Sequence, residues 1–131
     1  MNPETKTKIL IIDDDKFLLD MYSLKFSKGG YEVNTAFNGE EAITKIKGGY
    51  IPDVILSDVI MPVMDGLNFL KNLHAEKLAP SATIVMLSNQ GQNEDIEAAK
   101  ALGIDGYIVK ALTIPSEVLE QVDKIHKSKN T

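Results

Sequence analysis

The chain has 131 residues, of which 44% are hydrophobic and 25% charged, a length and composition that suit one globular domain. It contains no cysteine, which excludes disulfides, thiolate metal sites and a thiol nucleophile. The net charge is −5 and all 14 basic residues are lysines, so we expect neither a nucleic-acid surface nor bidentate phosphate clamps. The apolar run 9–12 is too short for a signal-peptide core or a membrane span, and we expect a cytoplasmic protein.

Five short apolar segments alternate with helical patterns along the chain. Each segment is bounded by Gly, Pro, Asp or Ser, and the five span 8–12, 31–37, 53–57, 82–88 and 106–110. Four of them are nearly continuous in aliphatic and β-branched residues, which is typical of strands covered on both faces. The second contains Glu32, Asn34 and Thr35, and this polarity favours an edge position.

Several of the helical patterns begin with a capping residue. Asp15 precedes a helix expected from about Lys16 to Lys28, and Asp65 is a cap candidate for the third helix. Asn38 and Glu41 have the spacing of a capping box ahead of the second helix. Residues expected to face the core from the later helices recur at helical spacing, namely Ala42, Ile43, Ile46, Leu67, Leu70, Leu73, Val118, Leu119, Val122 and Ile125.

Glycine and histidine positions complete the local predictions. Gly48 and Gly103 are expected to end their helices in the left-handed conformation. His74 and His126 lie in helical segments near lysines, so exposed helix faces or favourable charge at a helix end account for them. Met61 and Met64 are expected to fill the loop after the third strand against the core.

Five consecutive βα units predict an α/β domain with one doubly wound, five-stranded parallel sheet and helices on both faces. In such sheets ligands bind beyond the carboxyl ends of the strands. Polar residues stand at four of these ends: Asp13, Asp14 and Asp15 after the first strand, Asp58 after the third, Ser88 and Asn89 after the fourth, and Lys110 after the fifth. We therefore expect these side chains to meet at one edge of the sheet.

Asp13, Asp14 and Asp58 would repel one another as free anions at this edge. Two unit charges about 4 Å apart repel by roughly 4 kcal/mol at an effective dielectric constant near 20. A hard cation removes the conflict, and Mg²⁺ binds through one or two carboxylates and recruits phosphate oxygens, with Mn²⁺ as a substitute. With a cation and Lys110 in place, Asp58 becomes a usable nucleophile toward phosphorus.

Four segments carry a family resemblance: ILIIDDD, PDVILSDVIMPVMDG, VMLSNQG and GYIVK. In order and spacing they resemble the signature blocks of response-regulator receiver domains of two-component signalling, over almost the whole chain. The resemblance implies a flavodoxin-like (βα)5 fold with strand order 2-1-3-4-5. It also implies a signalling module rather than an enzyme, with one receiver domain over 1–131, an ordered core at about 7–127 and no output domain.

The resemblance also assigns roles at the acidic end of the site. Asp58 would accept a phosphoryl group from a phosphohistidine on a sensor histidine kinase or phosphotransfer protein. Asp14 directly, and Asp13 through water, would hold Mg²⁺ together with Asp58 and the backbone carbonyl of Ile60.

Further roles follow for the remaining strand-end residues. Ser88 and the backbone amide of Asn89 would hydrogen-bond phosphoryl oxygens, and Lys110 would pair with another. Tyr107 matches the aromatic residue that changes rotamer as the hydroxyl residue moves. The signal would then reach a downstream protein, or a second copy of the chain, on the surface formed by helix 93–103, strand 106–110 and helix 115–127.

Two features depart from the usual family pattern. Ala111 stands where the family usually has a proline after its lysine, so a cis or a trans Lys110–Ala111 peptide remains open. Ile60 and Gln90 flank the path of attacking water and vary within the family, so the phosphoryl lifetime also remains open.

Two other functions conflict with residues of the chain, and a third stays open. A phosphatase of the haloacid dehalogenase type needs a second acid two residues after its nucleophile, where this chain has Ile60. A flavodoxin-type flavin carrier needs a neutral, hydroxyl-rich loop after the first strand, where Asp13, Asp14 and Asp15 would repel phosphate. The alternative that stays open is a degenerate receiver acting as a constitutive interaction module.

Overall fold

The computed structural model describes residues 6–89, 93–110 and 113–129. Within these ranges five strands form one parallel sheet in the order β2-β1-β3-β4-β5, which confirms the predicted topology. The strands are β1 Lys8–Ile12, β2 Glu32–Ala36, β3 Val54–Asp58, β4 Thr83–Ser88 and β5 Gly106–Val109. The helices are α1 Lys16–Lys28, α2 Gly39–Lys47, α3 Gly66–Ala75, α4 Asn93–Ala101 and α5 Pro115–Lys129.

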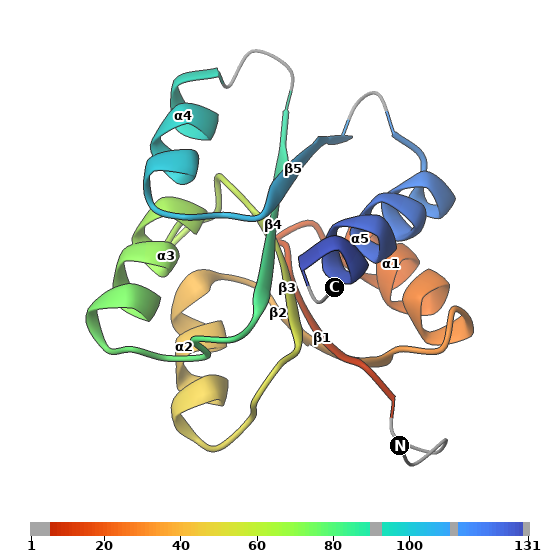
Figure 1. Cartoon of the computed structure of the whole chain (residues 1–131), viewed down its shortest axis with the longest axis horizontal. Helices are drawn as coiled ribbons and strands as arrows, with labels where there is room; N and C mark the ends of the chain where they lie inside the picture. Colours follow the sequence, from red (N-terminus) through yellow and green to blue (C-terminus); the bar gives the residue numbers. More distant parts are fainter. Residues whose placement is uncertain (1–5, 90–92, 111–112, 130–131) are drawn as a thin grey trace.

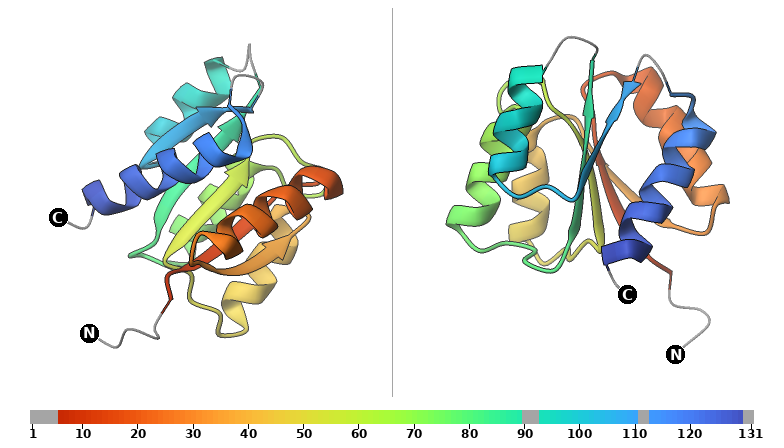
Figure 2. Two further views of the ribbon diagram at one scale, coloured as in Figure 1. Left: turned by 90° about the vertical axis from the view of Figure 1, so that its right-hand side faces the viewer. Right: turned by 45° about the horizontal axis from the view of Figure 1, so that its top comes forward.

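The five helices cover the two faces of the sheet, with α1 and α5 on one side and α2, α3 and α4 on the other (Figure 1). Side chains alternate between the faces of a strand, so the sheet supplies two separate cores. Leu10, Ile55 and Met86 pack toward α2, α3 and α4, whereas Ile11 and Leu56 pack toward α1 and α5. The carboxyl ends of the strands meet at the same edge of this three-layered arrangement (Figure 2).

Local chemistry explains where the first three helices begin and end. The side chains of Asp15, Asn38 and Asp65 each accept a hydrogen bond from a backbone N–H three residues later, so all three predicted caps are confirmed. The predicted left-handed end of α2 at Gly48 is wrong, because Gly48 has φ −75° and the next residue, Gly49, has φ +112°. Gly103 has φ +91°, as predicted.

The carboxyl-terminal end of helix α5 is hydrogen-bonded to the amino-terminal edge of the sheet. Lys129 Nζ donates to the carbonyl of Ala82 at 2.7 Å and to Asp105 Oδ2 at 3.1 Å. His126 lies in the last turn of α5, in line with the helix-end expectation, but it is half-buried rather than on an exposed face, and its Nδ1 lies 2.8 Å from Thr83 Oγ1. Among the described residues, no helix combines the length and apolar character needed to cross a membrane.

Candidate functional site

Three acidic side chains meet where β1 and β3 end side by side. Asp13 and Asp14 directly follow β1, and Asp58 is the last residue of β3 rather than the residue after it. One carboxylate oxygen from each residue lies within 4.8 Å of the other two. Asp13 is fully buried and Asp58 is 5% exposed, whereas Asp14 is open to solvent. The sequence-based expectation that these acids share one site agrees with this geometry.

Lys110 is the shared counter-ion of the two buried acids. Its Nζ lies 2.9 Å from Asp13 Oδ2 and 2.9 Å from Asp58 Oδ2, and its side chain is only 12% exposed. Burial acts against the charged form of Lys110, but the two carboxylates beside its ammonium outweigh that effect and raise its pKa. The ammonium is therefore fully charged at neutral pH.

The ionised form of the Asp58 carboxyl is disfavoured even though Lys110 lies beside it. Burial raises the pKa of its carboxyl above the usual 3.8, the hydrogen bond and charge of Lys110 lower it, and the negative charge of Asp13 raises it again. The net direction is upward. An ionised Asp58 thus lowers the stability of the metal-free fold.

Metal-free Asp58→Asn is expected to be more stable than the parent at neutral pH. Because the folded-state pKa of Asp58 is raised, the folded state holds its proton more tightly than the unfolded state. The parent therefore loses stability as the pH rises from about 3.8 through the folded-state pKa, and the asparagine variant lacks that loss. Urea unfolding in EDTA across this pH range measures the difference, and a variant less stable than the parent at pH 7 would contradict it.

One oxygen of the cluster is left without a hydrogen bond. Asp13 Oδ1 accepts the backbone N–H of Asp15 at 2.9 Å. Asp13 Oδ2 lies at ion-pair distance from Lys110 but outside hydrogen-bond geometry, and it is the only buried side-chain polar atom without a hydrogen-bond partner among the residues that the structure describes. A fully buried carboxylate oxygen in this position fits a hard cation, as do the neighbouring carboxylates. The donor set suits Mg²⁺ or Mn²⁺.

The other predicted site residues stand around this cluster. Ser88 is the last residue of β4 and is 1% exposed, one position beyond Leu87, the register partner of Asp58. Asn89 and Ile60 are exposed at the same edge. The predictions for the Asn89 amide and the Ile60 carbonyl remain predictions. Ala111 and Gln90 lie outside the described residues. The isomer of the Lys110–Ala111 peptide and the phosphoryl lifetime therefore stay open.

The loop between β3 and α3 is built tightly against the acceptor strand. A Cβ atom on Gly66 would lie 2.5 Å from the backbone oxygen of Asp58, so only glycine fits here without movement. Met61 is 6% exposed and Met64 is partly buried against the same core, which confirms that both methionines fill this loop. Val63, in contrast, is 76% exposed with φ +66°, a left-handed conformation that a β-branched side chain rarely adopts.

Val63→Asn is expected to raise the free energy of unfolding by about 1 kcal/mol, because asparagine tolerates the left-handed conformation that strains valine. Thermal and urea unfolding measure the gain. Ile51→Asn is the matched control, since Ile51 is also an exposed β-branched residue, at 71%, but does not have a positive φ. An equal change in both variants would mean that surface polarity, rather than backbone strain, sets the result.

Two features near the site were missed from the sequence. Phe17, Met21 and Leu24 expose apolar side chains along α1, and their spacing of four and three residues could have revealed this stripe. The second is a contact between Tyr107 and Lys100, whose Nζ lies 5.0 Å from the centre of the tyrosine ring. Spacing alone does not predict that contact, because it joins the end of a helix to the following strand.

A parallel 2-1-3-4-5 sheet with its acids and lysine at the carboxyl edge defines a flavodoxin-like α/β protein with a receiver-type site. The sequence profile described as "Response regulator receiver domain" matches residues 9–123. The chain belongs to this family.

Curated relatives and solved structures agree with that assignment. The chain is 36% identical to chemotaxis protein CheY of Thermotoga maritima, over 92% of this chain and 98% of that protein. It is 35% identical to the alkaline phosphatase synthesis transcriptional regulatory protein PhoP of Bacillus subtilis, over 90% of this chain but 48% of that protein, so the chain spans about half of such longer regulators.

Structural similarity covers nearly all of the chain. The chemotaxis response regulator CheY4 of Vibrio cholerae superimposes with a TM-score of 0.83 at 35% identity, covering 92% of this chain and 99% of that one. A CheY-like receiver domain protein from Methanospirillum hungatei JF-1 gives a TM-score of 0.86 at 27% identity, covering 96% and 98%.

Proposed function

We propose that this receiver domain accepts a phosphoryl group on Asp58 from a phosphohistidine of a sensor histidine kinase or phosphotransfer protein in the cytoplasm. The observation that carries the proposal is the meeting of Asp13, Asp14, Asp58 and Lys110 at the carboxyl edge of the sheet. This edge is where ligands bind in open parallel sheets.

The chemistry follows from the residues that surround Asp58. A carboxylate oxygen of Asp58 forms the new bond to phosphorus as the bond from phosphorus to the donor imidazole nitrogen breaks, and the electron pair stays on that nitrogen. Lys110, already within 2.9 Å of Asp58 Oδ2, pairs with a phosphoryl oxygen, and Ser88 with the Asn89 amide provides hydrogen bonds.

A divalent cation fits the remaining charge of the site. Asp13, Asp14, Asp58 and the Ile60 carbonyl would hold Mg²⁺, or Mn²⁺ in its place, and the ion would neutralise charge on the phosphoryl oxygens. The transferred group then alters the surface formed by α4, β5 and α5, where a downstream protein or a second copy of the chain binds.

The experiment that tests this function is intact mass spectrometry after incubation with acetyl phosphate. One phosphoryl adduct is expected on the parent in Mg²⁺, with none on Asp58→Asn and none after EDTA. Asp20→Asn is a matched control, because Asp20 is an exposed acid on α1 and should leave uptake unchanged. An adduct that persists in Asp58→Asn would contradict the assignment, and a parent unmodified by acetyl phosphate and by a phosphorylated histidine donor would favour a constitutive interaction module.

The apolar stripe on α1 provides a place for a protein donor. Phe17 is 72% exposed at the end of α1 that begins just after the acidic cluster, and Leu24 is 59% exposed on the same helix. Between α1 and the start of α5 lies a groove of about 310 Å³, lined by Met21, Leu24, Lys25, Lys28, Pro115 and Ser116. An apolar surface beside the acceptor suits a macromolecular donor rather than a small phosphate ester.

Leu24→Ser is expected to slow phosphoryl transfer from a histidine donor protein about tenfold, the effect of losing one well-placed interface side chain. Uptake from acetyl phosphate should not change, because that donor does not contact α1. Rates are measured with both donors on the parent, on Leu24→Ser and on Ile51→Ser, an exposed apolar control before β3. Equal slowing with acetyl phosphate would indicate a disturbed site rather than a lost docking surface.

A further inference from the structure

Tyr107 lies on β5 close to the predicted hydroxyl residue, and its side chain is 43% exposed. Side chains two residues apart share a face of the sheet, so Tyr107 lies on the same face as Val109. Val109 is the register partner of Ser88 in β4. Tyr107 is thus a neighbour of Ser88 on the face covered by α4, and its ring points toward solvent in this conformation.

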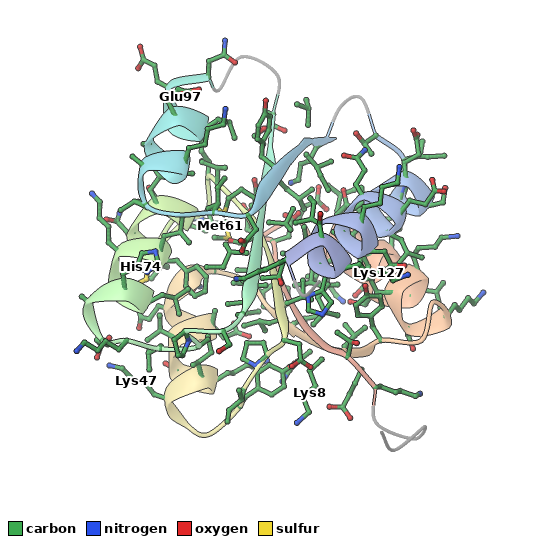
Figure 3. All side chains as sticks on the ribbon, viewed as in Figure 1. Lys8, Lys47, Met61, His74, Glu97 and Lys127 are labelled. Atoms are coloured by element: carbon green, nitrogen blue, oxygen red, sulfur yellow. The ribbon has the colours of Figure 1, made fainter. Side chains whose placement is uncertain are left out.

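The exposed ring has a cationic partner on the last turn of α4. Lys100 Nζ lies 5.0 Å from the ring centre, within the range of a cation–π interaction. The same ammonium lies 3.4 Å from Glu97 Oε1, one turn earlier on the helix. Glu97 extends from α4 at the top left of Figure 3. Lys100 is therefore shared between a carboxylate of its own helix and the ring of β5.

We propose that Lys100 is a brake on activation, because its ammonium stabilises Tyr107 in the exposed position. This inference rests on the proposed function and on the change of Tyr107 rotamer that the family resemblance implies when Ser88 moves. An interaction made only in the exposed state favours that state, and any ligand of the other state must overcome it. Cation–π contacts at exposed sites correspond to about a two- to fivefold change in such an equilibrium.

The sign of the effect separates a brake from a general electrostatic role. If Lys100 only contributed positive charge near the site, its removal would weaken the binding of an anionic phosphoryl analogue. If Lys100 holds the ring outward, its removal strengthens that binding. A change at Glu97 should act in the opposite direction. Glu97→Gln frees the Lys100 ammonium from its ion pair, strengthens its contact with the ring, and should weaken analogue binding.

The test is a calorimetric titration with beryllofluoride in saturating Mg²⁺, which measures the binding affinity. Lys100→Met is expected to bind about two- to fivefold more tightly than the parent, while Lys100→Arg, which keeps a cation, should bind like the parent. Lys71→Met is the matched control, an exposed lysine on α3, and it should show no gain. All of these positions are open to solvent, so the variants are expected to fold.

A double-mutant cycle assigns the effect to the ring. In a Tyr107→Leu background, Lys100→Met should change beryllofluoride affinity by no more than Lys71→Met does. A gain that persists without the ring would overturn the brake, as would unchanged or weaker binding by Lys100→Met in the parent background. If the parent itself fails to bind beryllofluoride, the proposed function and the brake both fall; if only the Lys100 effect is missing, the proposed function stands without the brake.

Discussion

Lys110→Met is expected to lower the free energy of unfolding of the metal-free protein by about 3 kcal/mol at pH 7. The substitution keeps the apolar stem of the side chain but removes the ammonium that lies 2.9 Å from Asp13 and from Asp58. Two buried carboxylates then share the site without a cation and repel each other. Urea unfolding in EDTA, followed by circular dichroism, measures the loss.

Lys16→Met is the control for removing an ion-paired lysine. Lys16 pairs with Asp20 at 3.1 Å, but the side chains are 74% and 67% exposed, so its loss should cost less than about 1 kcal/mol. The two lysines differ mainly in burial and in the number of acids that they neutralise. A similar small loss in both variants would mean that Lys110 is not the shared counter-ion inferred from the geometry.

Mg²⁺ is expected to stabilise the parent by about 2.7 kcal/mol at one hundred times its dissociation constant, because a ligand that binds only the folded state stabilises it by mass action. Asp13→Asn should lose most of this gain, since it replaces the fully buried carboxylate whose Oδ2 lacks a hydrogen bond. Unfolding curves with Mg²⁺ and with EDTA measure both values.

The control for the metal effect is Asp20→Asn, which removes an exposed acid that is not part of the cluster and should keep the full gain. Identical unfolding of the parent with Mg²⁺ and with EDTA would remove the metal from the proposed function. A constitutive interaction module would then explain the chain better than a phosphoryl acceptor.

The fold was predictable because its signals are local and repeated. Three of the four nearly continuous apolar segments form the inner strands β1, β3 and β4, and the polar second segment forms the edge strand β2. The fourth forms β5, and the expectation that it is covered on both faces is wrong, because β5 is the other edge strand and only Ile108 in it is buried. Parallel topology then placed the strand ends at one edge, which is enough to bring Asp13, Asp58 and Lys110 together without any knowledge of contacts.

The failures depend on context that the sequence does not show. Two glycines follow α2, and either can take the left-handed position, so local preference could not choose Gly49 over Gly48. His126 contacts Thr83, 43 residues away, and only the packed fold creates that pair. Val63 adopts a conformation that its own side chain disfavours, so local preference gives no signal for it.

The fastening of α5 has a consequence for how the molecule can move. Lys129 and His126 tie the end of the helix to Ala82, Thr83 and Asp105, at the edge of the sheet opposite the acidic cluster. The final turns of α5 are thus bound to the sheet, and its first turn is the part of the helix farthest from these contacts. We therefore expect a small displacement at the carboxyl edge of the sheet to move Ser116 the most and Lys127 the least.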